Sequence, residues 1–512
     1  MKDFTLAEIA KACNGEYVGD ESLKNTKITS VERDSRQVKN GSLFLAIKGE
    51  RVDGHDFIEK CFAQGAVCAL CEKAPENATK PCIVVPSTLD AVKKIGRAYR
   101  EKFDIPVIGI SGSVGKTSTK EMLYAVLSQK FKTHKTQGNL NNELGVPLTL
   151  LSMPEDTEAA VIEMGISDFG EMTRLSEMVQ PTICVLTIIG ECHLENLGDR
   201  DGVLKAKTEM FKNARENADF ILNGDDDKLS TVKTVNGKKP VFFGLDAKND
   251  FYAKNIKNSG DGKVLATLCF DNNNIDVEIP AIGTYMVTNA LAAAAAGKLL
   301  GLTDEEIANG VASYKTVGSR ANVINTGKIK IIDDCYNANP TSVRASLDTL
   351  SNLDGRKVAI LGDMKELGSE ELKLHFDTGV YAKSKDIGTV ITVGELAKEL
   401  AKGADGKAFD TIEDAKPEIL KTIKSGDVVL VKASHSCSLK TLLSFSNRIF
   451  DLPQKNVDKS KIQSYNCLIK KKPVSKNSRF FQSFQRVSGW CKLTAEDLPN
   501  GLVRAGRKPF GK

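Results

Sequence analysis

The 512-residue sequence has few aromatic residues, only five His, and no apolar run long enough to cross a bilayer. Its first residues lead into an amphipathic pattern without the apolar segment of a secretory signal. The twelve Cys are scattered without the spacing of a disulfide framework, so we expect reduced thiols. These absences argue against membrane insertion and favour a cytoplasmic location. The length predicts about three domains.

Acidic residues are scarce in one region only. Residues 453–512 contain fourteen Lys and Arg but three Asp and Glu, so the rest of the chain carries a net charge of −6 within the total of +5. A mildly acidic body does not indicate nucleic-acid binding, and we expect no nucleic-acid partner. For residues 453–512 we predict a basic tail with little structure. An arm that binds nucleic acid or an anionic surface is the alternative.

The rest of the sequence is organised around a glycine loop at residues 111–117. An apolar β pattern leads into this loop, and a helical pattern with one apolar face follows it. Converging backbone N–H groups and a helix N-terminus favour an anion, so the arrangement predicts a phosphate site. Lys116 is expected to reach the outer phosphates of a nucleotide, and Thr117 to bind Mg²⁺. The strict phosphate-loop pattern is not met because Ile110 replaces its first Gly, and an ordinary turn is the alternative.

Two further apolar strands end in side chains that can bind metal. Glu163 follows the buried strand pattern of residues 159–162, where a nucleotide fold needs a Mg²⁺ ligand. His193 follows the apolar residues 183–189 and stands near carboxylates. The alternatives are a capping or surface Glu and a structural His.

Three polar stretches are candidates for ligand contacts. The Asn-rich residues 137–147 cannot pack as core and form a loop that is either solvated or lines a site. Within residues 34–57, two glycine turns and several polar side chains bracket one strand and suggest a pocket for a polar ligand. Ordinary turn chemistry explains the spacing of those residues better. Asn289 lies early on an Ala-rich helix, where its amide can cap the helix or contact a ligand.

Residues 319–452 alternate regularly between strand and helix patterns, which predicts a parallel sheet with right-handed crossovers. Polar residues follow its first two strands, at 333–339 and at 363–366. Such residues mark the ligand-binding edge of a parallel sheet. Two α/β domains with polar rims predict a site in the cleft between them.

Together these stretches resemble the Mur ligase family over about residues 1–436. The resemblance rests on an ordered set of motifs, which are residues 111–117, 139–147, 163–165, 193–195, 206–207, 289–291, 333–340 and 361–368. The motif sequences at residues 336–340 and 361–368 are similar to those of the last ligase of that pathway rather than to those of the other ligases.

The resemblance implies an α/β fold with the three-domain Mur ligase architecture. Residues 1–105 would form an N-terminal domain for the UDP end of a substrate, and residues 106–318 a central ATP-binding P-loop ATPase domain. Residues 319–452 would form a Rossmann-like C-terminal domain that receives D-alanyl-D-alanine. The likeness stops after Ser436, and the change of pattern predicts that residues 437–512 are out of frame.

The resemblance also implies residue roles. ATP would contact Ser111, Gly112, Ser113, Val114, Gly115, Lys116, Thr117, Asn289, Arg320, Asp334 and Asn337. The Mg²⁺ ligands would be Thr117, Glu163, His193 and Lys207 as a carbamate, and the catalytic set Lys116, Lys207, His193 and Glu163. The muramoyl substrate would contact Ser35, Asn139 and Asn142. At 285–286, Tyr-Met stands where family members often have His-Asn.

The implied activity is an ADP-forming ligation for peptidoglycan synthesis, and thereby for cell shape and division. D-alanyl-D-alanine would be joined to UDP-N-acetylmuramoyl-tripeptide through an acyl phosphate, with ATP and Mg²⁺ as cofactors and the protein as a monomer. A sibling Mur ligase or a folylpolyglutamate synthase-like ligase is one alternative. A nucleotide-dependent switch that hydrolyses ATP without ligation is another.

Overall fold

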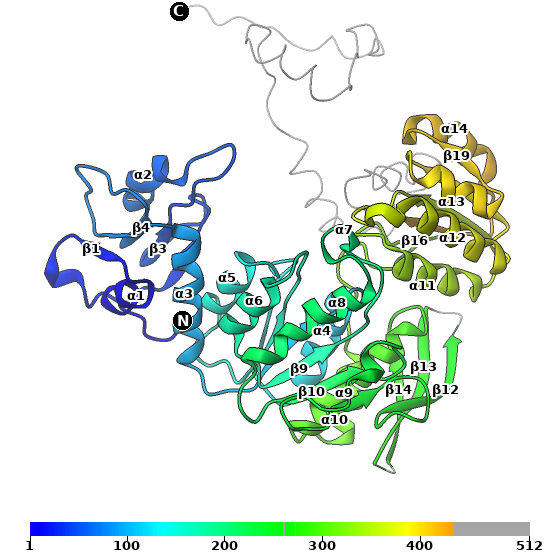
Figure 1. Cartoon of the computed structure of the whole chain (residues 1–512), viewed down its shortest axis with the longest axis horizontal. Coiled ribbons are helices and arrows are strands. Elements are labelled where there is room, and N and C mark those ends of the chain that lie inside the picture. Colours follow the sequence, from blue (N-terminus) through cyan, green and yellow to red (C-terminus); the bar gives the residue numbers. More distant parts are fainter. Residues whose placement is uncertain (260–261, 272, 435–512) are drawn as a thin grey trace, which may run out of the picture. The chain divides into compact units, whose positions relative to one another are not determined.

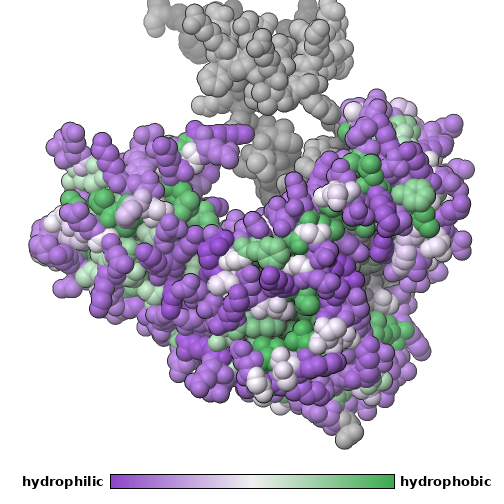
Figure 2. All heavy atoms as spheres, viewed as in Figure 1, coloured by the Kyte–Doolittle hydropathy of each residue, from purple (hydrophilic) through white to green (hydrophobic). Residues whose placement is uncertain are grey.

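The computed structural model describes residues 1–259, 262–271 and 273–434. The chain divides into two compact units, Met1–Asp451 and Leu452–Lys512, and only the first contains described residues. The predicted basic tail and frame shift therefore lie outside the described residues. Among the described helices, none combines the length and apolar character that a membrane span requires. Hydrophilic residues cover most of the face drawn in Figure 2, with smaller hydrophobic groups between them.

The first described sheet has five strands. These are β1 (Glu16–Val18), β2 (Ser30–Glu32), β3 (Ser42–Leu45), β4 (Cys68–Cys71) and β5 (Cys82–Val84), accompanied by α1 (Leu6–Cys13), α2 (Ile58–Ala63) and α3 (Thr88–Glu101) (Figure 1). The strand order is β1-β5-β4-β3-β2, with β1 antiparallel to β5 and the other pairs parallel. β3 and β4 are buried along their whole length, as expected for apolar parallel strands covered on both faces.

The second described sheet has six parallel strands and carries the glycine loop. They are β6 (Val107–Ser111), β7 (Thr133–Lys135), β8 (Ala159–Glu163), β9 (Ile183–Leu186), β10 (Asp219–Asn223) and β11 (Val241–Phe243). Their order is β11-β10-β9-β6-β8-β7, which places β6 between β8 and β9. The carboxyl ends of these three neighbouring strands therefore lie together, with the glycine loop, Glu163 and the segment leading to His193.

Helices cover both faces of this sheet. They are α4 (Lys116–Leu127), α5 (Gly145–Leu151), α6 (Glu171–Val179), α7 (Leu194–Leu197), α8 (Arg200–Thr208), α9 (Tyr285–Leu299) and α10 (Asp304–Ala312). Along β8, Ala160 and Ile162 pack in one core cluster, with α5, α6 and α8, and Val161 packs in a second, with α4, α9 and α10. Residues 292–296 of α9 are all buried Ala, and these small side chains let α9 lie close to α4.

A small antiparallel sheet follows in the chain. Its strands are β12 (Tyr252–Ser259), β13 (Lys263–Phe270) and β14 (Asn273–Ile279), in that order. The alternating burial of β14 shows that one face is packed and the other faces solvent.

The last described sheet has six strands, which are β15 (Asn322–Asn325), β16 (Lys330–Asp333), β17 (Arg356–Gly362), β18 (Thr389–Val393), β19 (Lys407–Phe409) and β20 (Asp427–Lys432). Its helices are α11 (Pro340–Ser351), α12 (Glu371–Ser384), α13 (Ala397–Ala404) and α14 (Ile412–Thr422). The order is β15-β16-β20-β17-β18-β19, and all pairs except β15–β16 are parallel. The predicted parallel sheet is therefore confirmed, with an additional antiparallel edge strand.

Helix α3 is joined to the second sheet's helices through a buried cation. The Arg100 side chain is fully buried, and its guanidinium donates to the carbonyl oxygens of Phe103 at 2.7 Å, Val179 at 2.9 Å and Gln180 at 3.3 Å. Val179 and Gln180 end α6, where carbonyl groups lack partners within the helix. Burial lowers the pKa of Arg100 to about 10. Arg100 thereby caps α6 from a helix of the N-terminal part.

Candidate active site

The glycine loop connects β6 to α4 in the predicted strand-loop-helix arrangement. Gly112 has φ +149° and Gly115, which precedes the first residue of α4, has φ +87°. A Cβ atom on Gly112 would lie 2.0 Å from Oγ1 of Thr187, so only glycine fits there. The twelve-residue α4 thus begins directly at the loop, with its N–H groups available to an anion.

Lys116 is the first residue of α4, and its side chain folds back over the loop. Its Nζ atom donates to the carbonyl oxygen of Gly112 at 2.8 Å. Desolvation lowers the pKa of the Lys116 ammonium, while the charge of Glu163 opposes that shift. The cation is therefore held at the position where a bound phosphate would compensate it.

Glu163 and Thr117 meet behind the loop. Oγ1 of Thr117 donates to the two carboxylate oxygens of Glu163 at 2.9 and 3.1 Å. Nδ2 of Asn141 donates to Glu163 Oε1 at 2.8 Å, and the Glu163 side chain is almost fully buried. The sequence left a surface Glu open as an alternative, and this burial rules it out.

His193 lies at the start of α7 in the left-handed conformation, with φ +52°. Its buried Nδ1 atom is 2.5 Å from Oε2 of Glu366, but no described residue offers it a partner with hydrogen-bond geometry. Burial lowers the pKa of His193, and Glu366 opposes that shift. A neutral imidazole can act as a metal ligand through a ring nitrogen.

Lys207 lies on α8 with its side chain almost fully buried. Among the described residues, none forms a hydrogen bond or ion pair with its ammonium. Burial lowers the pKa of Lys207 to about 8, and the positive charge of Lys116 adds to this effect. An amine with so low a pKa is available as a nucleophile near neutral pH.

A cavity of about 950 Å³ opens above the loop. Most of the predicted site residues line it together, and these are Ser113, Val114, Gly115, Lys116, Thr117, Asn142, Glu163, His193, Asn289, Arg320, Asp334 and Asn337. Residues associated with both the second sheet and the last sheet therefore line the cavity. The sequence predicted such a cleft from the polar strand ends of the two α/β regions.

Five predicted residues are not among those that line the cavity. Ser111 and Gly112 are buried at the start of the glycine loop, where Ser111 Oγ donates to the carbonyl oxygen of Met164 at 2.7 Å. Lys207 is buried on α8, close enough to Lys116 for the two positive charges to repel each other. Asn139 is exposed in its loop, and Ser35 lies after β2 in the first sheet. The substrate contacts of Asn139 and Ser35 stay predictions.

The residues from the last sheet are fixed by charge and stacking. The Arg320 guanidinium lies 3.8 Å above the ring of Tyr336. Asp334 accepts hydrogen bonds from Nζ of Lys432 at 2.5 Å and from Oγ of Ser346 at 2.7 Å. On the side of the cavity formed by the second sheet and its helices, Oδ1 of Asn289 accepts a hydrogen bond from Oγ1 of Thr119 on α4 at 2.9 Å.

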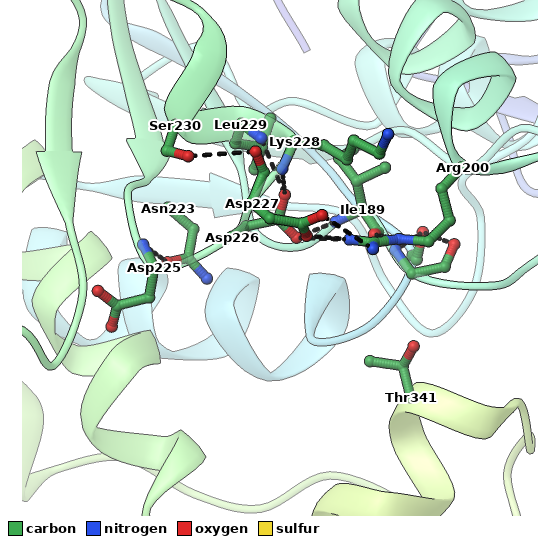
Figure 3. A network of polar contacts seen from close by, with 12 residues as sticks. Ile189, Arg200, Asn223, Asp225, Asp226, Asp227, Lys228, Leu229, Ser230 and Thr341 are labelled. Atoms are coloured by element: carbon green, nitrogen blue, oxygen red, sulfur yellow. Dashed lines mark hydrogen bonds and ion pairs between the residues drawn. The ribbon is translucent and has the colours of Figure 1, made fainter. Parts of the chain in front are cut away.

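A further network of polar side chains, which the sequence did not single out, borders the cavity (Figure 3). Asp226 accepts from the backbone N–H groups of Ile189, Lys228 and Leu229 at 2.9 to 3.0 Å. Nε of Arg200 donates to the Ile189 carbonyl at 2.8 Å, and its other nitrogens bond Asp227. The side chains of Asp226 and Arg200 therefore bond the backbone N–H and carbonyl groups of Ile189, which lies shortly before His193 in the chain.

The donor set suits Mg²⁺. The hydroxyl of Thr117, the carboxylate of Glu163 and a ring nitrogen of His193 are hard or borderline ligands next to the glycine loop. Within the described residues there is no cluster of three or more His, Cys, Asp and Glu side chains that could hold a metal. Mg²⁺ sites in proteins commonly combine one or two carboxylates with waters and substrate phosphates.

Comparisons with known proteins agree with this geometry. Residues 27–101 match the Mur ligase family catalytic domain, residues 110–297 the Mur ligase middle domain, and residues 319–435 the Mur ligase glutamate ligase domain. A UDP-N-acetylmuramoyl-tripeptide–D-alanyl-D-alanine ligase of Bacillus subtilis is 36% identical over 86% of this chain and 97% of its own length.

Solved structures are similar over the same range. MurF from Acinetobacter baumannii is 33% identical with a TM-score of 0.81, covering 87% of this chain and 98% of that one. MurF from Thermotoga maritima in complex with ADP is 29% identical with a TM-score of 0.74, covering 82% of this chain and 98% of that one. The chain belongs to the Mur ligase family.

Proposed function

We propose that this chain joins D-alanyl-D-alanine to UDP-N-acetylmuramoyl-tripeptide and acts as a monomer. The reaction is the one named for the Bacillus subtilis relative. The observation that carries the proposal is the cavity in which a phosphate loop faces polar residues from the last sheet. The Thermotoga maritima relative with bound ADP supports ATP as the nucleotide.

In the first half-reaction, a carboxylate oxygen of the tripeptide attacks the γ-phosphorus of ATP. The bond from the γ-phosphorus to the bridging oxygen breaks, ADP leaves, and an acyl phosphate forms. Lys116 and the N–H groups at the start of α4 oppose the repulsion between the carboxylate and the phosphates. Ser111 to Thr117 would surround the phosphates, while Asn289, Arg320, Asp334 and Asn337 would contact the rest of the nucleotide.

Thr117, Glu163 and His193 would hold Mg²⁺. When bound, Mg²⁺ neutralises phosphate charge and polarises the phosphoryl oxygens. Lys207 would contribute a further carboxylate if its amine carries CO₂ as a carbamate. The low pKa of Lys207 supports this role, because carbamate formation needs the neutral amine.

In the second half-reaction, the amine of D-alanyl-D-alanine attacks the acyl carbon, and phosphate leaves as the amide forms. Water would hydrolyse the acyl phosphate, so the reaction needs an enclosed cavity. The last sheet and its loops would hold the dipeptide on one side of that cavity. Ser35, Asn139 and Asn142 would contact the muramoyl substrate on the other.

Phosphate release by the purified full chain tests this function. With ATP, Mg²⁺ and UDP-N-acetylmuramoyl-tripeptide, we expect sustained release only after D-alanyl-D-alanine is added. Replacing the dipeptide by single amino acids tests a sibling ligase activity. Release that needs no acceptor would instead indicate an ATPase that does not ligate.

A further inference from the structure

A chain of four charges lies directly behind the phosphate loop, and the proposed reaction leaves three of its members unused. Lys120 and Glu121 lie on α4, Lys135 on β7 and Glu163 at the end of β8. Nζ of Lys120 is 3.3 Å from Oε1 of Glu121 and 3.4 Å from Oε2 of Glu163. Lys135 pairs with the other carboxylate oxygen of Glu121. The signs alternate along this chain, so each carboxylate faces an ammonium.

Lys120 is the most deeply buried of the four, with 0% of its side chain exposed. Its only other partner among the described residues is the carbonyl oxygen of Gly138, at 3.4 Å. A buried ammonium is costly unless it is paired, and Lys120 cannot move to solvent without rearranging the core. Its charge is therefore fixed next to Glu163.

This fixed charge has opposite effects on Glu163 and on a metal bound there. Before a cation binds, Lys120 compensates the buried carboxylate, to which Thr117 and Asn141 add hydrogen bonds. A divalent cation bound by the same carboxylate would lie close to the ammonium, and like charges repel strongly in a partly buried site. The phosphates of a nucleotide would supply the negative charge that offsets this repulsion.

We propose that Lys120 is a positioning residue that orients Glu163 and weakens the binding of a divalent cation in the absence of nucleotide. The cation then enters together with the nucleotide rather than ahead of it. The inference rests on the proposed function, in which Glu163 is a metal ligand.

Titration of the full chain with Mn²⁺, followed by electron paramagnetic resonance without nucleotide, tests this role. We expect Lys120→Met to bind Mn²⁺ about tenfold more tightly than the unmodified chain, because a fixed positive charge is removed. Lys120→Arg retains the charge and should stay within about twofold. Lys135→Met is the matched control, because Lys135 pairs with Glu121 rather than with Glu163, and it should also stay within about twofold. Unchanged or weaker binding by Lys120→Met would overturn the proposal.

Two further variants separate this inference from the proposed function. Glu163→Gln should lose Mn²⁺ binding; if it binds Mn²⁺ like the unmodified chain, the metal role of Glu163 in the proposed function fails. If Lys120→Met does not fold, Lys120→Met combined with Glu121→Gln keeps the net charge of the four residues at zero. The same tightening of about tenfold is expected in that background, and its absence there counts against Lys120.

Discussion

Arg100 and Lys207 are both buried cations, but their surroundings differ. Arg100 donates hydrogen bonds to three carbonyl oxygens where α3 meets α6. Lys207 lies on α8 near Lys116, and no described residue pairs with its ammonium. Burial lowers the pKa of both groups, that of Lys207 to about 8. Burial alone therefore does not distinguish the two cations; the number of satisfied hydrogen bonds does.

The difference separates a region that maintains the fold from a region that is poised for chemistry. Next to Arg100, Tyr99 also donates to the carbonyl oxygen of Met153 at 2.9 Å, which adds a second buried hydrogen bond between α3 and the central part of the chain. Around Lys207, the neighbouring groups Lys116 and His193 also have lowered pKa values. Groups with perturbed pKa values cluster at active sites. The predictions that follow test this contrast.

The largest effect is expected at the phosphate loop. Lys116→Ala removes the cation that opposes phosphate repulsion, and we expect ligation to fall by about 10³-fold or more. Because this amine pairs only with Gly112 among described residues, the thermal midpoint should change little. Phosphate-release kinetics and thermal melting measure the two quantities. A folded Lys116→Ala protein with normal turnover would remove the loop from the mechanism.

Lys207→Ala should lower ligation by about 10²-fold or more, because the proposed carbamate is lost. Added short-chain carboxylic acids should restore part of the rate by supplying a carboxylate at the same place. The matched control is Lys205→Ala on the same helix, since Lys205 is exposed near Phe169. Failure of rescue, with Lys207→Ala folded, would count against the carbamate.

Arg100→Met should act on stability instead of chemistry. It leaves three carbonyl oxygens without their donor, and we expect the free energy of unfolding to fall by about 4 kcal/mol. Arg97→Met on the same helix removes only exposed pairs with Glu101 and Glu177 and should cost less than about 1 kcal/mol. Urea unfolding measures both. Equal losses in the two variants would contradict the structural role of Arg100.

The smallest effect is a pH-dependent gain in stability. The pKa of Lys207 falls from 10.5 to about 8 in the fold, so its burial costs most below pH 8, where the amine is charged in both states. Lys207→Met should therefore raise the free energy of unfolding by about 3 kcal/mol near pH 7 and by about 2 kcal/mol near pH 9. Urea titrations in CO₂-free buffer measure the gain. A gain that grows with pH would contradict the assignment.

Local patterns predicted the elements that carry the site. The apolar strand, the Gly pair and the amphipathic helix around Lys116 are continuous in the sequence, and the structure confirms that arrangement. The parallel strands of the last sheet were predicted for the same reason. The resemblance to the Mur ligase family is confirmed by the comparisons.

Features that depend on packing between distant residues could not be predicted. Spacing gave no reason to select Lys207, because its low pKa arises from burial against neighbours remote in sequence. Lys120 looks like a surface residue one turn into a helix, yet it is buried against Glu163. The antiparallel β15 at the sheet edge was missed because its short, mostly exposed residues lack an apolar pattern.

The central claim is that a peptide carboxylate is activated by the nucleotide held at the Lys116 loop. The most direct measurement supplies UDP-N-acetylmuramoyl-tripeptide with ¹⁸O in its terminal carboxylate, together with ATP, Mg²⁺ and D-alanyl-D-alanine. The account predicts one ¹⁸O atom in each phosphate released, because the attacking oxygen leaves with phosphorus when the amide forms. Amide formation with unlabelled phosphate, or phosphate release without the amide, would contradict it.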